Sequence, residues 1–275
     1  MRSDDVKAAA CSVHCGDNLP YLERLPPGCC DLIYLDPPFF TGKHRKTADQ
    51  SAGFSDRWDG GIASYLSFMQ PRLAQCHRVL AEHGTLYLHC DWRVCHHLRI
   101  GLDELFGRSN FMNEIVWHYR TGGLSRRWFA RKHDTILVYA RRLGKHRFHV
   151  LRHGEFRTDG LKRDSRGRPY KSTKKGRLYF NAEGPALTDV WDVPFLSTVS
   201  NERVAWPTQK PQALLERIIL ASSDPGDLVA DFFCGSGTAL AAAKMLGRRW
   251  LGCDVSPEAV RIAKRRLSRL RVTTL

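Results

Sequence analysis

The sequence has no long apolar run and no pattern of paired cysteines. No stretch reaches the roughly 18 apolar residues of a membrane-spanning helix, and no apolar segment follows Met1 as it would in a secretory signal. The nine cysteines are an odd and scattered set, unlike the disulfide framework of a small secreted protein. These absences predict a cytoplasmic protein with no membrane partner.

Acidic residues are scarce in one part of the chain. Between His118 and Ala182 there are four Asp and Glu residues against 19 of the 43 Lys and Arg residues. This stretch therefore holds the whole net charge of +15, and the rest of the chain is neutral. Charge of one sign at this density predicts a polyanionic partner, of which nucleic acid is the most obvious.

The rest of the composition is that of a globular protein with one or two domains. The 275 residues are 43% hydrophobic and 26% charged, which is enough to bury a core without disulfide bonds. Strand and helix signals alternate along most of the chain and predict an α/β fold with a parallel sheet. Between Arg141 and Asn181 the apolar periodicity is lost, so a long loop or small insertion is expected there. Strands are expected at 12–15, 31–36, 85–89, 113–117, 135–139, 228–232 and 250–253, and helices at 18–25, 65–82, 94–106, 211–222, 238–246 and from 257 onward.

A glycine-containing turn follows the strand expected at 228–232. The segment Asp231-Phe232-Phe233-Cys234-Gly235-Ser236-Gly237-Thr238 leads into a helix, where glycines and free backbone N–H groups admit a ligand. Asp254 ends the next strand, at an offset that suits hydrogen bonds to ribose hydroxyls. A dinucleotide-binding motif would have its third glycine at position 240, which is Leu. The pattern therefore favours a nucleoside without phosphates, and a plain tight turn is the alternative.

Two prolines follow a carboxylate at the end of an earlier strand. In Asp36-Pro37-Pro38-Phe39 the prolines stiffen the backbone just beyond the strand expected at 31–36, where active sites of α/β proteins form. A flat base could stack on Phe39 while its amino group bonds to Asp36 and to the Pro37 carbonyl. On these four residues alone, a strand-ending turn with a buried phenylalanine is an equal alternative.

Together these motifs resemble the β class of amino-methylating DNA methyltransferases. The resemblance rests on Asp36–Phe39, on Thr208-Gln209-Lys210-Pro211 and on Asp231–Thr238, and it is almost continuous from Trp206 to Leu267. The catalytic motif precedes the cofactor motif, which is the permuted order of that class. Coverage extends over the chain except for Arg141–Asn181 and the loop after Phe40.

The resemblance implies a Rossmann-like methyltransferase fold with a seven-stranded, mostly parallel sheet, and S-adenosyl-L-methionine as the methyl donor. In this scheme residues 1–140 are the catalytic half, 141–182 a basic, loop-rich insertion that is a candidate target-recognition region, and 183–275 the cofactor-binding half. The residues implied to bind the donor are Asp231, Phe233, Gly235, Ser236, Gly237 and Thr238 around it, Asp254 at the ribose, Asp17 and Asn18 at the adenine end, Thr208 and Lys210 at the methionine part, and also Asp36. The target base is implied to lie against Asp36, Pro37, Pro38 and Phe39.

The chemistry of an exocyclic amine fits this arrangement. Its lone pair is delocalised into the ring, so hydrogen bonds to Asp36 and to the Pro37 carbonyl would activate the nitrogen and offset its developing charge. No covalent intermediate is needed, and the sequence lacks the Pro-Cys dipeptide of C5-cytosine methyltransferases. In the family, Asp before Pro-Pro favours adenine N6. Cytosine N4, RNA or protein methylation, and a DNA-binding relative without activity are the alternatives.

Basic and aromatic residues alternate just after the strand at 113–117. Trp128 and Phe129 are flanked by basic residues, a pattern typical of DNA contact, and the phosphates are the expected targets. These candidates are Arg120, Arg126, Arg127, Arg131 and Lys132. Double-stranded DNA is the predicted partner, with a cognate restriction enzyme and a second copy of the chain as further candidates. No metal is expected, because the spacing of His89-Cys90 and Cys95-His96-His97 matches no standard zinc site.

Overall fold

The computed structural model describes residues 10–46, 53–197, 199–204 and 206–270. They divide into two compact units, one formed by Met1–Phe148 together with Asp189–Leu275 and the other by His149–Thr188. The second unit overlaps most of the insertion predicted at 141–182. Within the described residues, no helix has both the length and the hydrophobicity to cross a membrane.

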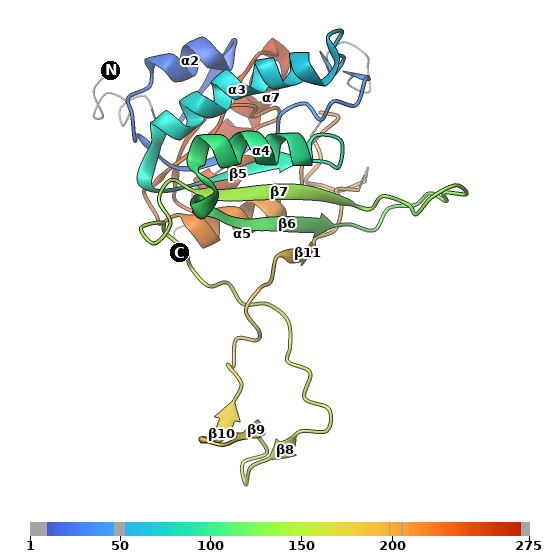
Figure 1. Ribbon diagram of the computed structural model, residues 1–275, viewed down its shortest axis with the longest axis vertical. Coiled ribbons are helices and arrows are strands. Elements are labelled where there is room, and N and C mark those ends of the chain that lie inside the picture. Colours follow the sequence, from blue (N-terminus) through green and yellow to red (C-terminus); the bar gives the residue numbers. More distant parts are fainter. Residues whose placement is uncertain (1–9, 47–52, 198, 205, 271–275) are drawn as a thin grey trace. The chain divides into compact units, whose positions relative to one another are not determined.

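A mixed sheet of eight strands runs through the first unit (Figure 1). The strand order is β1 (Ser12–Cys15), β13 (Arg249–Asp254), β12 (Leu228–Asp231), β2 (Cys30–Leu35), β5 (Leu80–Cys90), β7 (His133–Ala140), β6 (Phe111–His118) and β11 (Val190–Asp192). The first five of these strands run parallel, β7 is antiparallel to both of its neighbours, and β11 pairs parallel with β6. The predicted α/β fold with a mostly parallel sheet is confirmed. The expected number of seven strands is wrong, because the short β11 adds one more strand at the edge beyond β6.

Helices cover both faces of this sheet. One hydrophobic cluster joins it to α2 (Asn18–Arg24), α3 (Gly61–Val79) and α4 (Cys95–Phe106), and a second joins it to α5 (Gln212–Ser222), α6 (Thr238–Met245) and α7 (Pro257–Arg269). In β2, Ile33 and Leu35 belong to the first cluster, whereas Leu32 and Tyr34 belong to the second. A strand that is buried on both faces reads as a continuous apolar run, which explains why β2 was predictable.

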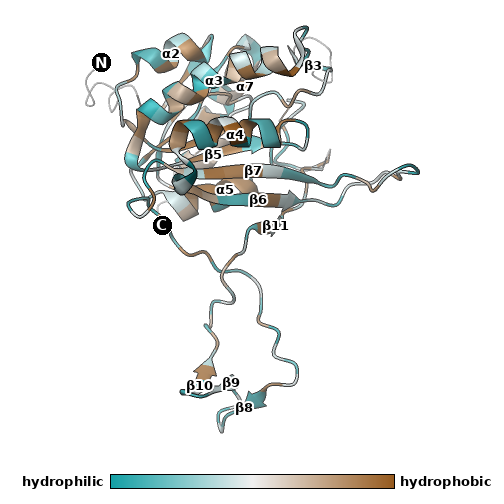
Figure 2. Ribbon diagram, viewed as in Figure 1, coloured by the Kyte–Doolittle hydropathy of each residue, from teal (hydrophilic) through white to brown (hydrophobic). Residues whose placement is uncertain are grey.

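Two smaller sheets lie outside the main one. In the segment after Phe40, β3 (His44–Lys46) pairs antiparallel with β4 (Gly53–Ser55). In the second unit, β8 (Lys162–Arg163), β9 (Pro169–Thr173) and β10 (Gly176–Tyr179) form an antiparallel sheet. No described residue of that unit belongs to either hydrophobic cluster, and Figure 2 shows β8 as hydrophilic. The sequence did not predict β8, β9 and β10, because none of their residues is buried and no apolar face leaves a periodic pattern.

The two ends of the second unit run side by side. The Leu187 amide donates to the Leu151 carbonyl at 2.9 Å, and the His153 amide donates to the Pro185 carbonyl at 3.1 Å. Arg152 and Ala186 form an antiparallel bridge between these segments. The first and last residues of the second unit are therefore neighbours in space.

Candidate active site

Three neighbouring parallel strands end at carboxylates. Asp36 follows β2, Asp231 ends β12 and Asp254 ends β13. Because adjacent parallel strands end at the same edge of a sheet, the three side chains converge there. With Trp206 and Lys210 they line a cavity of about 530 Å³.

The glycine-containing turn forms one wall of this cavity. The Gly235 amide donates to Asp254 Oδ2 at 2.8 Å, and the Ser256 amide donates to Asp254 Oδ1 at 2.9 Å. Gly235 has φ +48°, and a Cβ at this position would lie 3.0 Å from Nε1 of Trp206. Only glycine fits both this backbone conformation and this narrow space. The turn therefore holds the Asp254 carboxylate at the cavity and keeps Trp206 close to the backbone.

Burial raises the pKa of two of the carboxyl groups. Burial raises the pKa of Asp231 well above its usual value, and the charges of Asp36 and Asp254 raise it further, against a hydrogen bond from the Phe233 amide at 3.0 Å. Burial also raises the pKa of Asp254, which the amides of Ser256 and Gly235 oppose. A cationic ligand in the cavity would favour the ionised form of both groups.

Asp36 is paired with Lys210, which lies 174 positions later in the chain. The Lys210 ammonium forms an ion pair with Asp36 Oδ2 and lies 5.1 Å from the centroid of the Phe39 ring. A small adjoining cavity of about 50 Å³ is lined by the whole Asp36–Phe39 motif together with Thr208 and Lys210. The loop after the motif is anchored by buried Asp56, whose carboxylate accepts from the amides of Phe40 and Thr41 at 2.9 and 2.7 Å.

Most of the predicted donor-site residues meet at this edge. Gly237 does not line the cavity: it precedes α6 with φ +74°, and a Cβ there would lie 2.9 Å from Ala263 Cβ. Pro37 and Phe39 line only the small adjoining cavity. The predicted residues that line the large cavity are Asp36, Pro38, Thr208, Lys210, Asp231, Phe233, Gly235, Ser236, Thr238 and Asp254.

Asp17 and Asn18 lie outside the lining of the cavity, and their side chains hold the fold together. Asp17 caps α2 by accepting from the Leu19 amide at 3.0 Å and also accepts from Arg72 at 2.7 Å. Asn18 accepts from Arg72 Nε at 2.7 Å and donates to the Phe232 carbonyl at 2.7 Å. Through Phe232 these residues support the glycine-containing turn, and direct contact with a ligand stays a prediction.

Two residues near the carboxylates were not assigned to the site from the sequence. Trp206 faces Gly235 and lines the cavity. Its place just before the Thr208–Pro211 motif was the one signal in the sequence that could have assigned it to the site. His89 is fully buried beside the Asp36–Phe39 motif: its Nδ1 lies 2.8 Å from the Tyr34 hydroxyl and 3.9 Å from Asp36 Oδ1, and its Nε2 lies 3.2 Å from Asp134 Oδ2. In the described part of the chain, no three His, Cys, Asp or Glu side chains gather to hold a metal ion.

The predicted DNA-contact residues lie in the connection between β6 and β7, which projects beyond the sheet in Figure 1. Arg126 and Arg127 are exposed, and Arg120 is 84% exposed with a long contact of 3.6 Å to Asp192. Lys132 instead donates to the Thr121 and Gly122 carbonyls, each at 2.7 Å. Its ammonium is thus engaged within the connection itself.

Comparisons with known proteins agree with this geometry. A model of the N6/N4 family described as DNA methylase matches residues 30–265. The Type II methyltransferase M.HpaI of Haemophilus parainfluenzae is 32% identical over 253 residues, covering 92% of this chain and 73% of that protein. The DNA adenine methyltransferase YhdJ of Escherichia coli (strain K12) is 30% identical over 256 residues, covering 92% and 81%.

A solved structure shares the fold. The putative DNA modification methylase TTHA0409 of Thermus thermophilus, in complex with S-adenosyl-L-methionine, superposes with a TM-score of 0.59 at 22% identity, covering 94% of this chain and 93% of that chain. The family model, the relatives and the fold lead to one conclusion. The chain belongs to the N6/N4 family of DNA methylases.

Proposed function

We propose that this protein transfers a methyl group from S-adenosyl-L-methionine to N6 of an adenine that has left the DNA duplex. The observation that carries the proposal is the opening of Asp36, with Lys210 and Phe39 beside it, onto the cavity that Gly235 and Asp254 line. The name of the relative YhdJ, a DNA adenine methyltransferase, supports adenine as the target.

The residues of the large cavity suit this donor. When bound, S-adenosyl-L-methionine supplies a methyl group on a positively charged sulfur. Three carboxylates around a space of about 530 Å³ favour a cationic nucleoside and disfavour a pyrophosphate cofactor. Asp254 is placed to accept from ribose hydroxyls, and the aromatic rings of Trp206 and Phe233 offer apolar surface to the adenine.

The chain's own residues act mainly by position and charge. Asp36 accepts a hydrogen bond from the amine of the target base and stabilises the positive charge that develops on its nitrogen. The Pro37 carbonyl accepts from the same amine, and Phe39 is the stacking platform for a base outside the duplex. Alignment of the amine with the methyl group then supplies much of the rate enhancement.

The identity of the product tests the function. Incubation with isotope-labelled donor and a mixture of DNA, RNA and protein should place the label in DNA, and nucleoside analysis should find N6-methyladenine. N4-methylcytosine in its place would overturn the base assignment and keep the mechanism. Label found only in RNA or protein would overturn the proposed function.

The salt dependence of binding tests the predicted DNA contacts. If about six basic residues meet phosphates, the slope of log K against log salt should be near −5. Replacing Arg120, Arg126, Arg127 and Arg131 by glutamine should reduce that slope by about 0.9 for each phosphate that the variant no longer neutralises, with donor affinity unchanged. The matched control replaces four basic residues of α7 outside the basic stretch, namely Arg261, Lys264, Arg265 and Arg269. Equal slopes for the two variants would contradict the assignment.

The proposal also includes two further binding partners of the protein and its location in the cell. A restriction enzyme with the same recognition site is the first partner, since the relative M.HpaI is named a Type II methyltransferase. A second copy of this chain is the other, and sedimentation of the protein with and without DNA tests it. The bacterial origin of the relatives supports action in a bacterial cytoplasm.

The buried His89 is expected to position the catalytic motif. His89→Asn should lower kcat about tenfold, because one lost buried hydrogen bond costs about 1 to 1.5 kcal/mol. The KM for the donor should stay unchanged, since His89 does not line the large cavity. His83→Asn, on the same strand but partly exposed and paired with Asp31 at 2.8 Å, is the control. Wild-type kcat in a folded His89→Asn protein would rule out the positioning role.

A further inference from the structure

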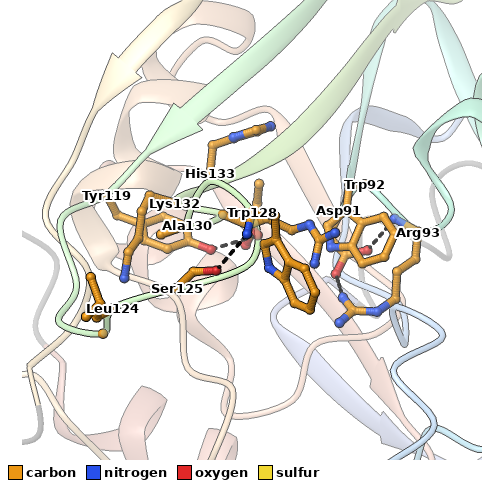
Figure 3. A pocket seen from close by; sticks show the side chains of 13 residues that line it. Asp91, Trp92, Arg93, Tyr119, Leu124, Ser125, Trp128, Ala130, Lys132 and His133 are labelled. Carbon is orange, nitrogen blue, oxygen red and sulfur yellow. Dashed lines mark hydrogen bonds and ion pairs between the residues drawn. The ribbon is translucent and has the colours of Figure 1, made fainter.

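A second cavity lies at the same edge of the sheet, beyond the end of β5. It has a volume of about 380 Å³ and lies between the loop that follows β5 and the connection from β6 to β7 (Figure 3). Its lining includes Asp91, Trp92, Tyr119, Trp128, Arg131 and Asp134. None of the residues proposed to hold the donor or the target base belongs to this lining.

Aromatic rings and a guanidinium group dominate this cavity. The Arg131 guanidinium lies 4.0 Å from the ring centroid of Trp92 and 5.6 Å from that of Trp128. Both indoles are solvent-exposed, Trp92 by 47% and Trp128 by 59%. Exposed aromatic faces beside a cation are the features with which proteins bind unstacked bases of nucleic acids. The nearby Arg126 and Arg127 add positive charge for the DNA backbone.

A buried side chain lies between this cavity and Asp36, and the distance between the cavity and Asp36 is short. His89, fully buried, lies between them, with its Nδ1 3.9 Å from Asp36 Oδ1 and its Nε2 3.2 Å from Asp134 Oδ2. A base held at Trp128 therefore cannot reach the catalytic carboxylate. Because one residue, His89, contacts both Asp36 and Asp134, the two cavities are close enough for one DNA molecule to occupy both.

We propose that the second cavity binds an unpaired nucleotide of the DNA substrate that neighbours the target base or stood opposite to it. This inference rests on the proposed function. Extrusion of one base removes stacking and pairing from its neighbours. Stacking a second base on Trp128, next to the Arg131 guanidinium that covers the Trp92 ring, stabilises the opened duplex. The carboxylate of Asp91 is paired with Arg93, and that of Asp134 contacts Tyr119 and His89, so the aromatic rings and the Arg131 guanidinium supply the binding surface.

Photo-crosslinking tests the occupant directly. Duplexes that contain the mapped methylation site would have 5-iodouracil or 5-iodocytosine at single positions within two nucleotides of the target, on either strand. With donor bound, we expect irradiation to link at least one of these positions to the peptides that contain Trp92 or Trp128. Trp128→Ala should remove the link to its peptide. Phe148→Ala, another exposed aromatic residue that lies outside the lining, should leave it intact.

The rate of methyl transfer is the second measurement. Trp128→Ala should lower kcat/KM roughly tenfold to a hundredfold, the effect of one lost base–aromatic stack, and Trp128→Phe should restore most of it. Since Trp128 is exposed, neither change should unfold the protein. Crosslinks to other peptides only, a crosslink from the target base alone, or wild-type kcat/KM in Trp128→Ala would overturn the inference. A wild-type protein that methylates no DNA would instead overturn the proposed function.

Discussion

Asp36→Ala should lower kcat by roughly a hundredfold or more, as loss of an oxyanion-hole donor does in other enzymes. The carboxylate accepts from an amine whose positive charge appears only during transfer, so its contribution is largest in the transition state. Donor and DNA affinities should change little, because the residues proposed to bind them are Asp254, Gly235 and the basic residues between His118 and Ala182. Single-turnover kinetics with separate measurement of both affinities checks this pattern.

The ion pair between Asp36 and Lys210 requires a control. Asp36→Ala leaves the Lys210 ammonium, 11% exposed, without its partner, and an unpaired charge could disturb the site by itself. The double variant Asp36→Ala with Lys210→Met removes both charges and should remain inactive. Recovery of activity in the double variant, or full activity in Asp36→Ala, would contradict a catalytic role for the carboxylate. Asp36→Asn should keep partial activity, because its amide oxygen still accepts a hydrogen bond.

Gly235→Val should abolish binding of S-adenosyl-L-methionine while the protein stays folded. A branched side chain at φ +48° would enter the space between the turn and Trp206 and displace the wall of the cavity. Isothermal titration calorimetry measures the loss directly. Gly247→Val is the matched control, since Gly247 has a similar φ of +73° and a Cβ there would have no neighbouring atom within 4 Å. This variant should lose stability through the same backbone strain and still bind the donor with wild-type affinity. Unchanged affinity in Gly235→Val would refute the assignment of this turn.

Strand ends were the part of the site that the sequence could predict. Asp36, Asp231 and Asp254 each follow a short apolar run, and in a parallel sheet such runs end at a common edge. Their convergence therefore follows from local patterns alone. The order of the strands does not, and neither does the extra strand β11, because three residues are too few to show a period.

Contacts between segments that are distant in the chain could not be predicted from local sequence patterns. The resemblance assigned Lys210 to the donor, whereas the structure pairs its ammonium with Asp36. His89 was considered only as a metal ligand, and the structure places it between Asp134 and Asp36. Both positions depend on the packing of residues that are far apart in the chain. Asp17 differs again, since a residue before a helix can cap it or bind a ligand with the same side chain.

The paired ends of the second unit make it an exchangeable module. Because the chain enters and leaves through adjoining segments near Leu151 and Leu187, a replacement of different length needs only to join the same two points. The large sheet and its carboxylates would keep their register, since 149–188 contributes no strand to that sheet and no residue to either hydrophobic cluster within the described chain. Evolution, or a protein engineer, can therefore vary this segment in length and sequence without rebuilding the catalytic edge.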